Sequence, residues 1–564
     1  MRILLVSTLM SLFLLACQHR TANESSTSAE NYAVREAPHS AVPPPPPPSI
    51  EEAANEEMEE AIEFVDQAVE TEMPYDQEAG NWEAITREEY APITENAFKS
   101  ALNEPLSTFS IDVDQASYSN CRRYLNQGVL PPPNAVRIEE FINYFDYDYP
   151  QAKDGHPFTV STEISDCPWA KGHKLAHIGI QGKTMETSEL PPSNLVFLLD
   201  VSGSMSDYNK LPLLKKAFKL LVQQLRAKDR VAIVVYAGAS GVVLPSTKGN
   251  DKRRIFEALD RLKAGGGTAG AAGIQLAYQL AESHLMPGGN NRVILATDGD
   301  FNIGMSSNDQ MKSLIESKRD QGIFLSVLGF GMGNYKDSKM EILADHGNGN
   351  YAYIDNLQEA RKVLVEGMTG TIFTIAKDVK LQLEFNPSKV KSYRLIGYEN
   401  RTLANEDFDD DQKDAGELGA GHTVTALYEI IPADAANAST ASTDHLKYQD
   451  RRITEAAKND PDWMTVKLRY KHPKETQSQL IVKTASDRGN TWANSSDNFR
   501  FSAAVAGFGL LLRNSAYKGN LKYDQVSAWI VDSMGKDKFG YRKELLNLVN
   551  TAERVDDRSV VESD

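Results

Sequence analysis

Positive charge is scarce in this 564-residue sequence. Its 60 lysine and arginine residues face 78 aspartates and glutamates, which leaves a formal net charge of −18. Nucleic-acid binding and general binding to anionic membranes both require a basic surface. The composition therefore argues against both of these partner classes. The hydrophobic share of 41% still supports globular cores, and the length suggests about three or four folding units.

Three common catalytic signatures are also missing. The sequence has no Walker A motif, no HExxH zinc motif and no G-x-S-x-G nucleophile elbow. Metal-assisted hydrolysis or phosphoryl transfer would need a base or nucleophile positioned beside the ion. The histidines of the central region, His284 and His346, fall in predicted helices or at their ends. We therefore predict that the protein is not an enzyme.

Cysteine is rare, and the first of the three cysteines lies in a targeting segment. A positively charged start precedes an apolar run up to Ala16, which is typical of a secretory signal and too short to span a bilayer comfortably. Leu14-Leu-Ala-Cys17 resembles a bacterial lipobox. The resemblance implies that residues 1–17 are a lipoprotein signal and that Cys17 carries the lipid. The alternative is an ordinary signal peptide. Gln18, in place of aspartate, favours the outer membrane by analogy with Gram-negative sorting rules.

The other two cysteines are Cys121 and Cys167. Two cysteines in an exported protein suggest a disulfide. The sequence cannot supply the Cα separation that such a bond requires. Whether they pair is therefore left open.

The stretch from 18 to 99 lacks sustained apolar periodicity. Six prolines from Pro43 to Pro48 favour an extended polyproline segment. An acidic stretch from Glu51 to Glu60 follows, with few apolar positions. The sequence predicts a disordered, proline-rich and acidic tether here.

The strongest site signal follows Leu195. The apolar run from Leu195 to Leu199 is typical of a strand buried on both faces of a parallel sheet. It leads directly into Asp200-x-Ser202-x-Ser204, whose side chains can point the same way in an extended or looped segment. One carboxylate and two hydroxyls would then lie at the carboxyl end of a strand, where open α/β sheets bind ligands. Taken alone, the pattern is equally compatible with a helix-capping turn.

Two later stretches add oxygen ligands. A glycine-rich loop from Gly265 to Gly270 contains Thr268, and a second buried-strand run ends at Asp298. Carboxylate and hydroxyl oxygens are hard donors, which suit Mg²⁺ or Mn²⁺ better than zinc. We predict one such ion, held by five residues: Asp200, Ser202, Ser204, Thr268 and Asp298.

Around this site, strand-like and helix-like segments alternate from 191 to 370. The expected strands are 195–199, 230–236, 242–244, 292–297, 323–329 and 351–354, and the expected helices are 211–226, 251–263, 270–285, 308–319, 337–345 and 356–369. Repeated strand-then-helix order predicts an α/β fold with a doubly wound, mostly parallel sheet.

The flanking regions have different patterns. Residues 100–190 contain strand-like runs at 158–164 and 174–180, residues 371–485 alternate with a period of two, and residues 486–564 are helical. The second region predicts a β-sandwich. Two strands alone bury too little surface to be stable, so we expect the runs before residue 191 to join that sandwich. The α/β domain would then be inserted into it, with both connections close together. The alternative is a chain of separately folded domains.

One further pair of carboxylates, Asp112 and Asp114, follows a strand-like run. The pair resembles a binding site formed by two carboxylates. A strand edge that leads into a helix cap is the simpler interpretation.

The five predicted ligands resemble the metal-ion-dependent adhesion site of von Willebrand factor type A domains. From about residue 100 to 555 the chain also resembles a bacterial family of lipoproteins that have a central type A domain between family-specific flanking regions. Four stretches carry this resemblance besides the metal residues: Pro105 to Asp114, Arg137 to Phe145, Ala296 to Asn302 and Gly416 to His422.

The resemblance implies a metal-dependent binding module displayed on a membrane of the cell envelope by its lipid anchor. One coordination position of the ion would be left for a carboxylate of a protein ligand. A structural scaffold of an envelope complex, with the ion only ordering loops, is the main alternative. A metal-dependent hydrolase is the other.

Overall fold

The computed structural model describes residues 88–561, apart from 153–154, 187, 269, 300–307, 333–334, 369, 371–372 and 436–451. The predicted lipid site at Cys17 and most of the predicted tether lie outside the described residues. The described residues belong to one compact unit. No helix in the described ranges combines the length and the apolar character needed to cross a bilayer.

The central region is a six-stranded sheet in the order β10-β9-β8-β5-β6-β7. Its strands are β5 (Ser193–Asp200), β6 (Arg230–Tyr236), β7 (Ser240–Lys248), β8 (Asn290–Thr297), β9 (Ile323–Phe330) and β10 (Tyr351–Ile354). All neighbours are parallel except β6 and β7. The predicted doubly wound, mostly parallel sheet is confirmed.

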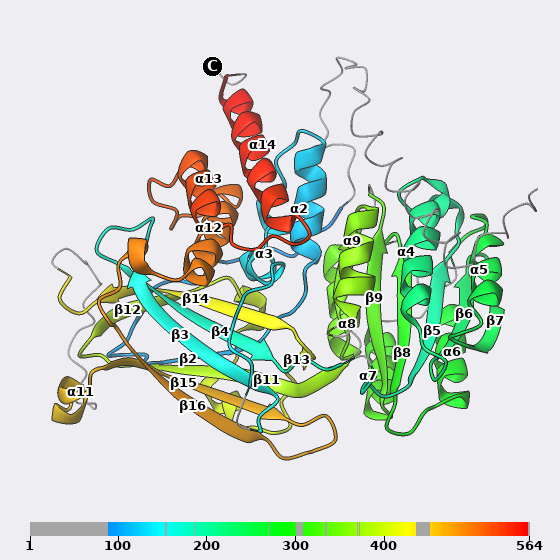
Figure 1. The fold of residues 1–564 in the computed structure, drawn as a ribbon, viewed down its shortest axis with the longest axis horizontal. Helices are drawn as coiled ribbons and strands as arrows, with labels where there is room; N and C mark the ends of the chain where they lie inside the picture. The colour runs from blue at the N-terminus through cyan, green and yellow to red at the C-terminus, as the bar shows by residue number, and fades with distance from the viewer. Residues whose placement is uncertain are drawn as a thin grey trace, which may run out of the picture. The chain divides into compact units, whose positions relative to one another are not determined.

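Helices cover both faces of this sheet (Figure 1). They are α4 (Leu211–Gln224), α5 (Lys252–Asp260), α6 (Gly270–Ser283), α7 (Asn308–Asp320), α8 (Asp337–His346), α9 (Leu357–Arg361) and a π-helical turn at Lys362–Glu366. Alternate residues of β5 belong to opposite cores: Phe197 packs with the cluster that includes α4 and α5, and Leu198 with the cluster that includes α6 and α8. Burial on both faces explains why the strand has no polar residue between Leu195 and Leu199.

Two antiparallel sheets pack into a sandwich. One has the order β1-β12-β14-β4-β3, and the other has the order β13-β11-β15-β16, with β2 also paired to β11. The strands are β1 (Lys99–Ser100), β2 (Leu106–Ser110), β3 (Phe158–Asp166), β4 (Lys174–Gly182), β11 (Thr374–Phe385), β12 (Val390–Ile396), β13 (Gly416–Gly419), β14 (Thr423–Pro432), β15 (Asp462–Lys471) and β16 (Gln479–Ser486). A single apolar cluster lies between the two sheets. The predicted sandwich is confirmed.

The sandwich takes strands from both sides of the α/β domain, as the insertion prediction requires. β4 pairs with β14 from Lys174 to Gln181 against Ile430 to Thr423, and β2 pairs with β11. The two connections also lie close together. The Arg226 guanidinium donates to the carbonyls of Leu190 and Pro191 at the entry and lies 5.9 Å from the ring of Phe373 at the exit.

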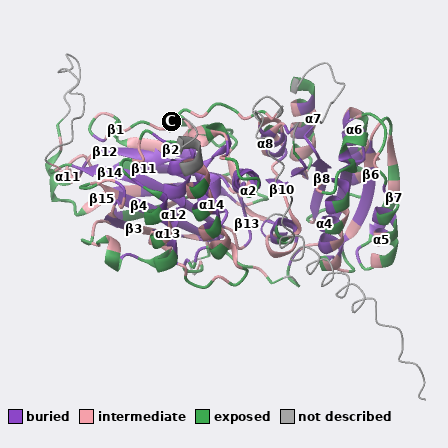
Figure 2. Cartoon of the chain, turned by 90° about the horizontal axis from the view of Figure 1, so that it is seen from above, coloured by how far each residue is buried: buried purple, intermediate pink, exposed green. Residues whose placement is uncertain are grey.

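Helices from both ends of the described chain share one apolar core. They are α2 (Ala116–Asn126) and α3 (Ile138–Asn143) from before the inserted domain, and α12 (Asp497–Leu512), α13 (Tyr523–Asp532) and α14 (Tyr541–Val561) from after it. Figure 1 shows α2, α12 and α14 together above the sandwich. α12 is buried along most of its length. Figure 2 shows the strands β6 and β8 of the central sheet mostly in purple, the colour of buried residues. Shorter elements are η2 (Pro133–Ala135), η3 (Gly203–Ser206), η5 (Glu399–Arg401), η6 (Asn405–Phe408), α11 (Glu455–Asn459) and η7 (Trp492–Asn494).

Cys121 and Cys167 are both buried in this helical core, and neither forms a disulfide. The Cys121 thiol lies 3.5 Å from the carbonyl oxygen of Ala135. Burial raises the pKa of both thiols, which disfavours the thiolate needed for exchange. The pairing considered from the sequence is therefore absent from this structure.

Candidate metal centre and interdomain contacts

Asp200 ends the central strand β5 and is fully buried. Its Oδ1 accepts a hydrogen bond from the backbone N–H of Ser202 at 2.9 Å. Its Oδ2 accepts from the hydroxyls of Tyr236 at 3.0 Å and Thr297 at 3.2 Å. Burial raises the pKa of Asp200, and the negative charge of Asp298 raises it further. These neutral donors fix the carboxylate in place without supplying a positive charge.

The two serine hydroxyls converge beside this carboxylate. Ser202 Oγ and Ser204 Oγ lie 3.0 Å apart. Ser202 is buried, whereas Ser204 is exposed in the short helix η3 that starts at Gly203. The pair therefore runs from the end of the sheet to the surface.

The glycine-rich loop is tied to this segment by its backbone. Gly203 N–H donates to the carbonyl of Gly266 at 3.0 Å, and Gly265 N–H donates to that of Val201 at 2.8 Å. Gly266 has a φ of +84°, and a Cβ there would lie 3.1 Å from the nitrogen of Gly238, so glycine suits this close approach. Thr268, which is half-buried, follows directly on the tied segment.

Asp298 follows the neighbouring strand β8 and has a cationic partner that the sequence did not indicate. Lys210 Nζ lies 3.1 Å from Asp298 Oδ2, and the lysine side chain is only 9% exposed. A Cβ at Gly331 would lie 2.3 Å from Cε of Lys210, so a glycine makes room for it. Lys210 and Asp298 are 88 residues apart in the chain, so no local sequence pattern indicates that they pair.

The donor set fits a hard divalent ion. Two carboxylates and two hydroxyls meet at the carboxyl ends of adjacent parallel strands, next to the Thr268 loop, and oxygen-only donors suit Mg²⁺ or Mn²⁺. Lys210 shows that a positive charge is stabilised at Asp298. Within the described ranges, no three His, Cys, Asp or Glu side chains gather as a metal cluster. An ion here would therefore depend on the hydroxyls of Ser202, Ser204 and Thr268.

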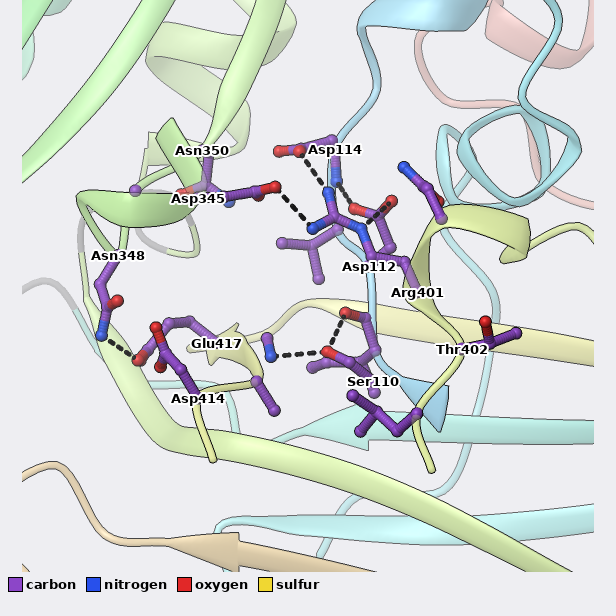
Figure 3. Close-up of a pocket in the computed structure, with 17 residues that line it drawn as sticks. Ser110, Asp112, Asp114, Asp345, Asn348, Asn350, Arg401, Thr402, Asp414 and Glu417 are labelled. Carbon is purple, nitrogen blue, oxygen red and sulfur yellow. Dashed lines mark hydrogen bonds and ion pairs between the residues drawn. The ribbon is translucent and has the colours of Figure 1, made fainter. Parts of the chain in front are cut away.

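Asp112 and Asp114 have a different role, which Figure 3 shows. Arg401 lies 3.1 Å from Asp112 Oδ2 and 3.3 Å from Asp114 Oδ2, and it also contacts Asp345 of the α/β domain at 2.8 Å. Asp114 Oδ1 accepts the backbone N–H of Tyr351 in β10 at 2.8 Å. The pair is thus not a helix cap. An arginine contacts both carboxylates and links three segments of the chain, beside a pocket of about 210 Å³ that the same residues line.

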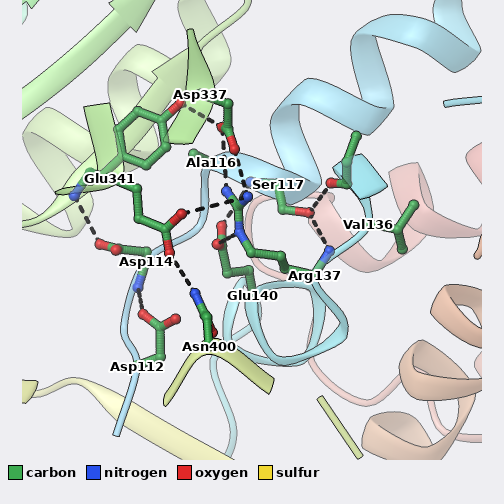
Figure 4. A network of polar contacts seen from close by, with 12 residues as sticks. Asp112, Asp114, Ala116, Ser117, Val136, Arg137, Glu140, Asp337, Glu341 and Asn400 are labelled. Carbon is green, nitrogen blue, oxygen red and sulfur yellow. Dashed lines mark hydrogen bonds and ion pairs between the residues drawn. The ribbon is translucent and has the colours of Figure 1, made fainter. Parts of the chain in front are cut away.

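A second arginine makes a similar connection nearby (Figure 4). Arg137 pairs with Glu140 of α3 and contacts Asp337 of α8 at 2.6 Å. Asn400 donates to Glu341 of α8 at 2.6 Å. These contacts hold the inserted domain against its flanking regions. They involve two of the stretches that carry the family resemblance, Pro105 to Asp114 and Arg137 to Phe145.

The fold and this site define a von Willebrand factor type A protein. The family model for the von Willebrand factor type A domain matches residues 194–365, and a von Willebrand factor model matches 84–177. The model for the C-terminal region of uncharacterized protein YfbK matches 370–555. The chain is 44% identical to uncharacterized protein YfbK of Escherichia coli (strain K12) over 480 residues, which is 83% of this chain and 82% of that protein. It therefore belongs to the YfbK family.

Other similarities are confined to parts of the chain. Uncharacterized protein sll0103 of Synechocystis is 31% identical over 36% of this chain and 47% of its own length. Inter-alpha-trypsin inhibitor heavy chain H3 of Bos taurus is 26% identical over 29% of this chain and 19% of its own. A von Willebrand factor type A structure from Catenulispora acidiphila is 14% identical and covers 70% of this chain and 92% of that one, with a TM-score of 0.38.

Proposed function

We propose that the protein is a metal-dependent binding module that takes a carboxylate of a protein partner at the type A domain. One observation carries this proposal: Asp200, Ser202, Ser204 and Asp298 meet at the end of β5 and β8, and the cluster reaches the surface at Ser204. A bound Mg²⁺ or Mn²⁺ would supply a Lewis-acidic position for the partner's carboxylate.

The chain's own residues divide into two groups at this site. Ser202, Ser204 and Thr268 offer neutral oxygens, which leave a bound ion electron-poor. Asp200 and Asp298 would hold the ion directly or through water. Because neutral donors already orient Asp200, little reorganisation is needed when an ion arrives.

An exposed aromatic side chain beside the site supports a protein partner. Tyr208 lies four residues after Ser204, and its side chain is 81% exposed. Tyrosine is enriched among the residues that dominate binding energy in protein interfaces. Its place between η3 and α4 puts it on the loop that also carries the serine ligands.

We propose binding rather than catalysis for the same site. Neither histidine of the domain has the role of a general base beside Asp200: His346 pairs with Glu316 of α7 at 2.8 Å, and His284 is exposed after α6. A lipid on Cys17 would hold the module at the membrane of a Gram-negative cell envelope, in the outer membrane if Gln18 sets its sorting. Replacing Cys17 with serine should remove lipid labelling, and unchanged labelling would contradict this anchor.

A scaffold role remains the second candidate, and the arginine contacts of Arg137 and Arg401 are the observation that favours it. Affinity capture from envelope extract separates the two. If the metal site binds the partner, capture falls when EDTA is added and in Asp200→Ala, but not in Asp320→Ala, an exposed change at the opposite end of the sheet. Capture that is equal in all four conditions would support the scaffold instead.

A further inference from the structure

A groove of about 570 Å³ starts where the candidate metal centre ends. Met205 and Ser206, which line it, directly follow Ser204. Ala264, on its other side, directly precedes the glycine-rich loop that leads to Thr268. The groove and the predicted ligands therefore share two segments of chain, and a ligand that reaches one can extend into the other.

This groove is positively charged in a protein that is strongly acidic overall. Four lysines line it, Lys215, Lys216, Lys219 and Lys263, together with one carboxylate, Asp260. Four positive charges minus one negative charge leave a net charge of three. The stretch 209–228, from which three of these lysines come, contains six lysine and arginine residues and no aspartate or glutamate.

Two of the four lysines make neither an ion pair nor a side-chain hydrogen bond within the described residues. Lys219 contacts Asp260 at 3.1 Å, and Lys215 donates to the carbonyls of Asp260 and Leu262 at the end of α5. Lys216 and Lys263 are exposed, and no salt bridge is recorded for either in the part of the chain that the structure describes. Their charges are available to a ligand.

The rest of the lining indicates the chemistry of that ligand. Apolar side chains, including Leu211, Pro212 and Leu262, line the groove together with the lysines. An acidic polypeptide offers carboxylates and apolar groups together, whereas a nucleic acid or a sulfated sugar offers a continuous row of anions. We propose that the lysine groove is a second subsite for an acidic polypeptide segment of the partner. One carboxylate of that segment lies at the metal centre, and further carboxylates face Lys216 and Lys263. This inference rests on the proposed function.

The test measures binding of a fluorescein-labelled peptide that alternates glutamate and alanine to the full-length protein, by anisotropy with saturating Mg²⁺. We expect EDTA to abolish binding, and the glutamine–alanine peptide not to bind. The double change Lys216→Gln with Lys263→Gln should weaken binding roughly fivefold, because each exposed charge pair contributes little. The effect should shrink as sodium chloride is added.

A matched pair of lysines provides the control. Lys483 in β16 and Lys536 after α13 are exposed and lie outside the type A domain, so changing both to glutamine alters the net charge equally. We expect no effect on peptide affinity. Equal weakening by both pairs, or by neither, would overturn the lysine subsite. Tighter binding of duplex DNA or heparin than of the peptide would overturn the assignment to an acidic polypeptide.

Calorimetry of Mg²⁺ on the same proteins separates this inference from the proposed function. Normal Mg²⁺ binding without peptide binding would overturn the subsite and leave the metal centre in place. Absence of Mg²⁺ binding by the wild-type protein would overturn both.

Discussion

Two groups of carboxylates in this protein differ in what neutralises them. Asp112, Asp114 and Asp337 each contact the guanidinium of Arg401 or Arg137. Asp200 instead accepts hydrogen bonds from a backbone N–H and two neutral hydroxyls. Both groups follow strands or begin helices, and both are rich in aspartate, so the sequence pattern alone does not distinguish them.

The difference shows how to tell a structural carboxylate from a ligand. A guanidinium neutralises the carboxylates around it, which disfavours a cation from solution, so Arg137 and Arg401 hold domains together. Neutral donors fix the direction of Asp200 but leave its charge uncompensated, which favours a cation from solution. Lys210 beside Asp298 is intermediate, because a single flexible ammonium can move away when an ion binds.

The largest expected effect is on stability, when an arginine is removed from the carboxylates that it holds between the domains. Arg137→Met leaves Asp337 and Glu140 buried without their partner, and removing one member of a buried pair costs about 3–5 kcal/mol. We expect a clearly lower midpoint of urea unfolding. Arg253→Met is the control, because that side chain is 82% exposed and its partner Glu257 lies 3.8 Å away. Equal midpoints for the two variants would contradict the structural role of Arg137.

Next in size is the effect of a predicted ligand on metal affinity. Asp298→Ala removes one of the two carboxylates, and we expect Mg²⁺ binding to weaken about a hundredfold or more, since even indirect contacts of ligands are worth about 10–100-fold. Isothermal calorimetry measures this directly. Asp112→Ala should leave the Mg²⁺ affinity of the folded protein unchanged. A loss of Mg²⁺ binding in Asp112→Ala alone would reverse the roles of the two groups.

The sequence predicted the central strand and the sandwich, but not the contacts between residues far apart in the chain. The apolar run before Asp200 indicated the central strand, because burial on both faces removes polar residues from it. The strand-like runs before the type A domain and the period-two runs after it indicated the shared sandwich. The sequence did not predict the arginine contacts, because Arg401 and Asp112 are 289 residues apart in the chain and no local pattern indicates such a partner. The packing of α3 against α12 and of α2 against α14 was not predicted for the same reason.

A smaller effect is expected at Lys210. Its ammonium competes with an ion for Asp298, so Lys210→Met should bind Mg²⁺ more tightly, by about tenfold, because a competing positive charge is removed. Lys228→Met, an exposed lysine in the same domain, is the matched control. Weaker Mg²⁺ binding in Lys210→Met would show instead that the lysine positions Asp298 for the ion.

The smallest expected effect is that of pH on Mg²⁺ affinity. Burial raises the pKa of Asp200, so its charged form is disfavoured in the folded, metal-free protein. The contribution of this group to stability therefore grows as pH falls through that raised pKa, whereas Mg²⁺ affinity falls, because the ligand must be deprotonated. Calorimetry between about pH 8 and about pH 5 should show weaker binding at the lower pH. A pH-independent affinity would contradict a role for Asp200.

Anomalous scattering from Mn²⁺ in a crystal of the protein compares the two carboxylate groups in a single measurement. We predict one manganese peak in contact with the hydroxyls of Ser202 and Ser204, and none between Asp112 and Asp114, where Arg401 lies. A crystal grown with Mn²⁺ that has no peak at the two serines, or a peak beside Asp112 and Asp114 instead, would contradict the assignment of the metal centre.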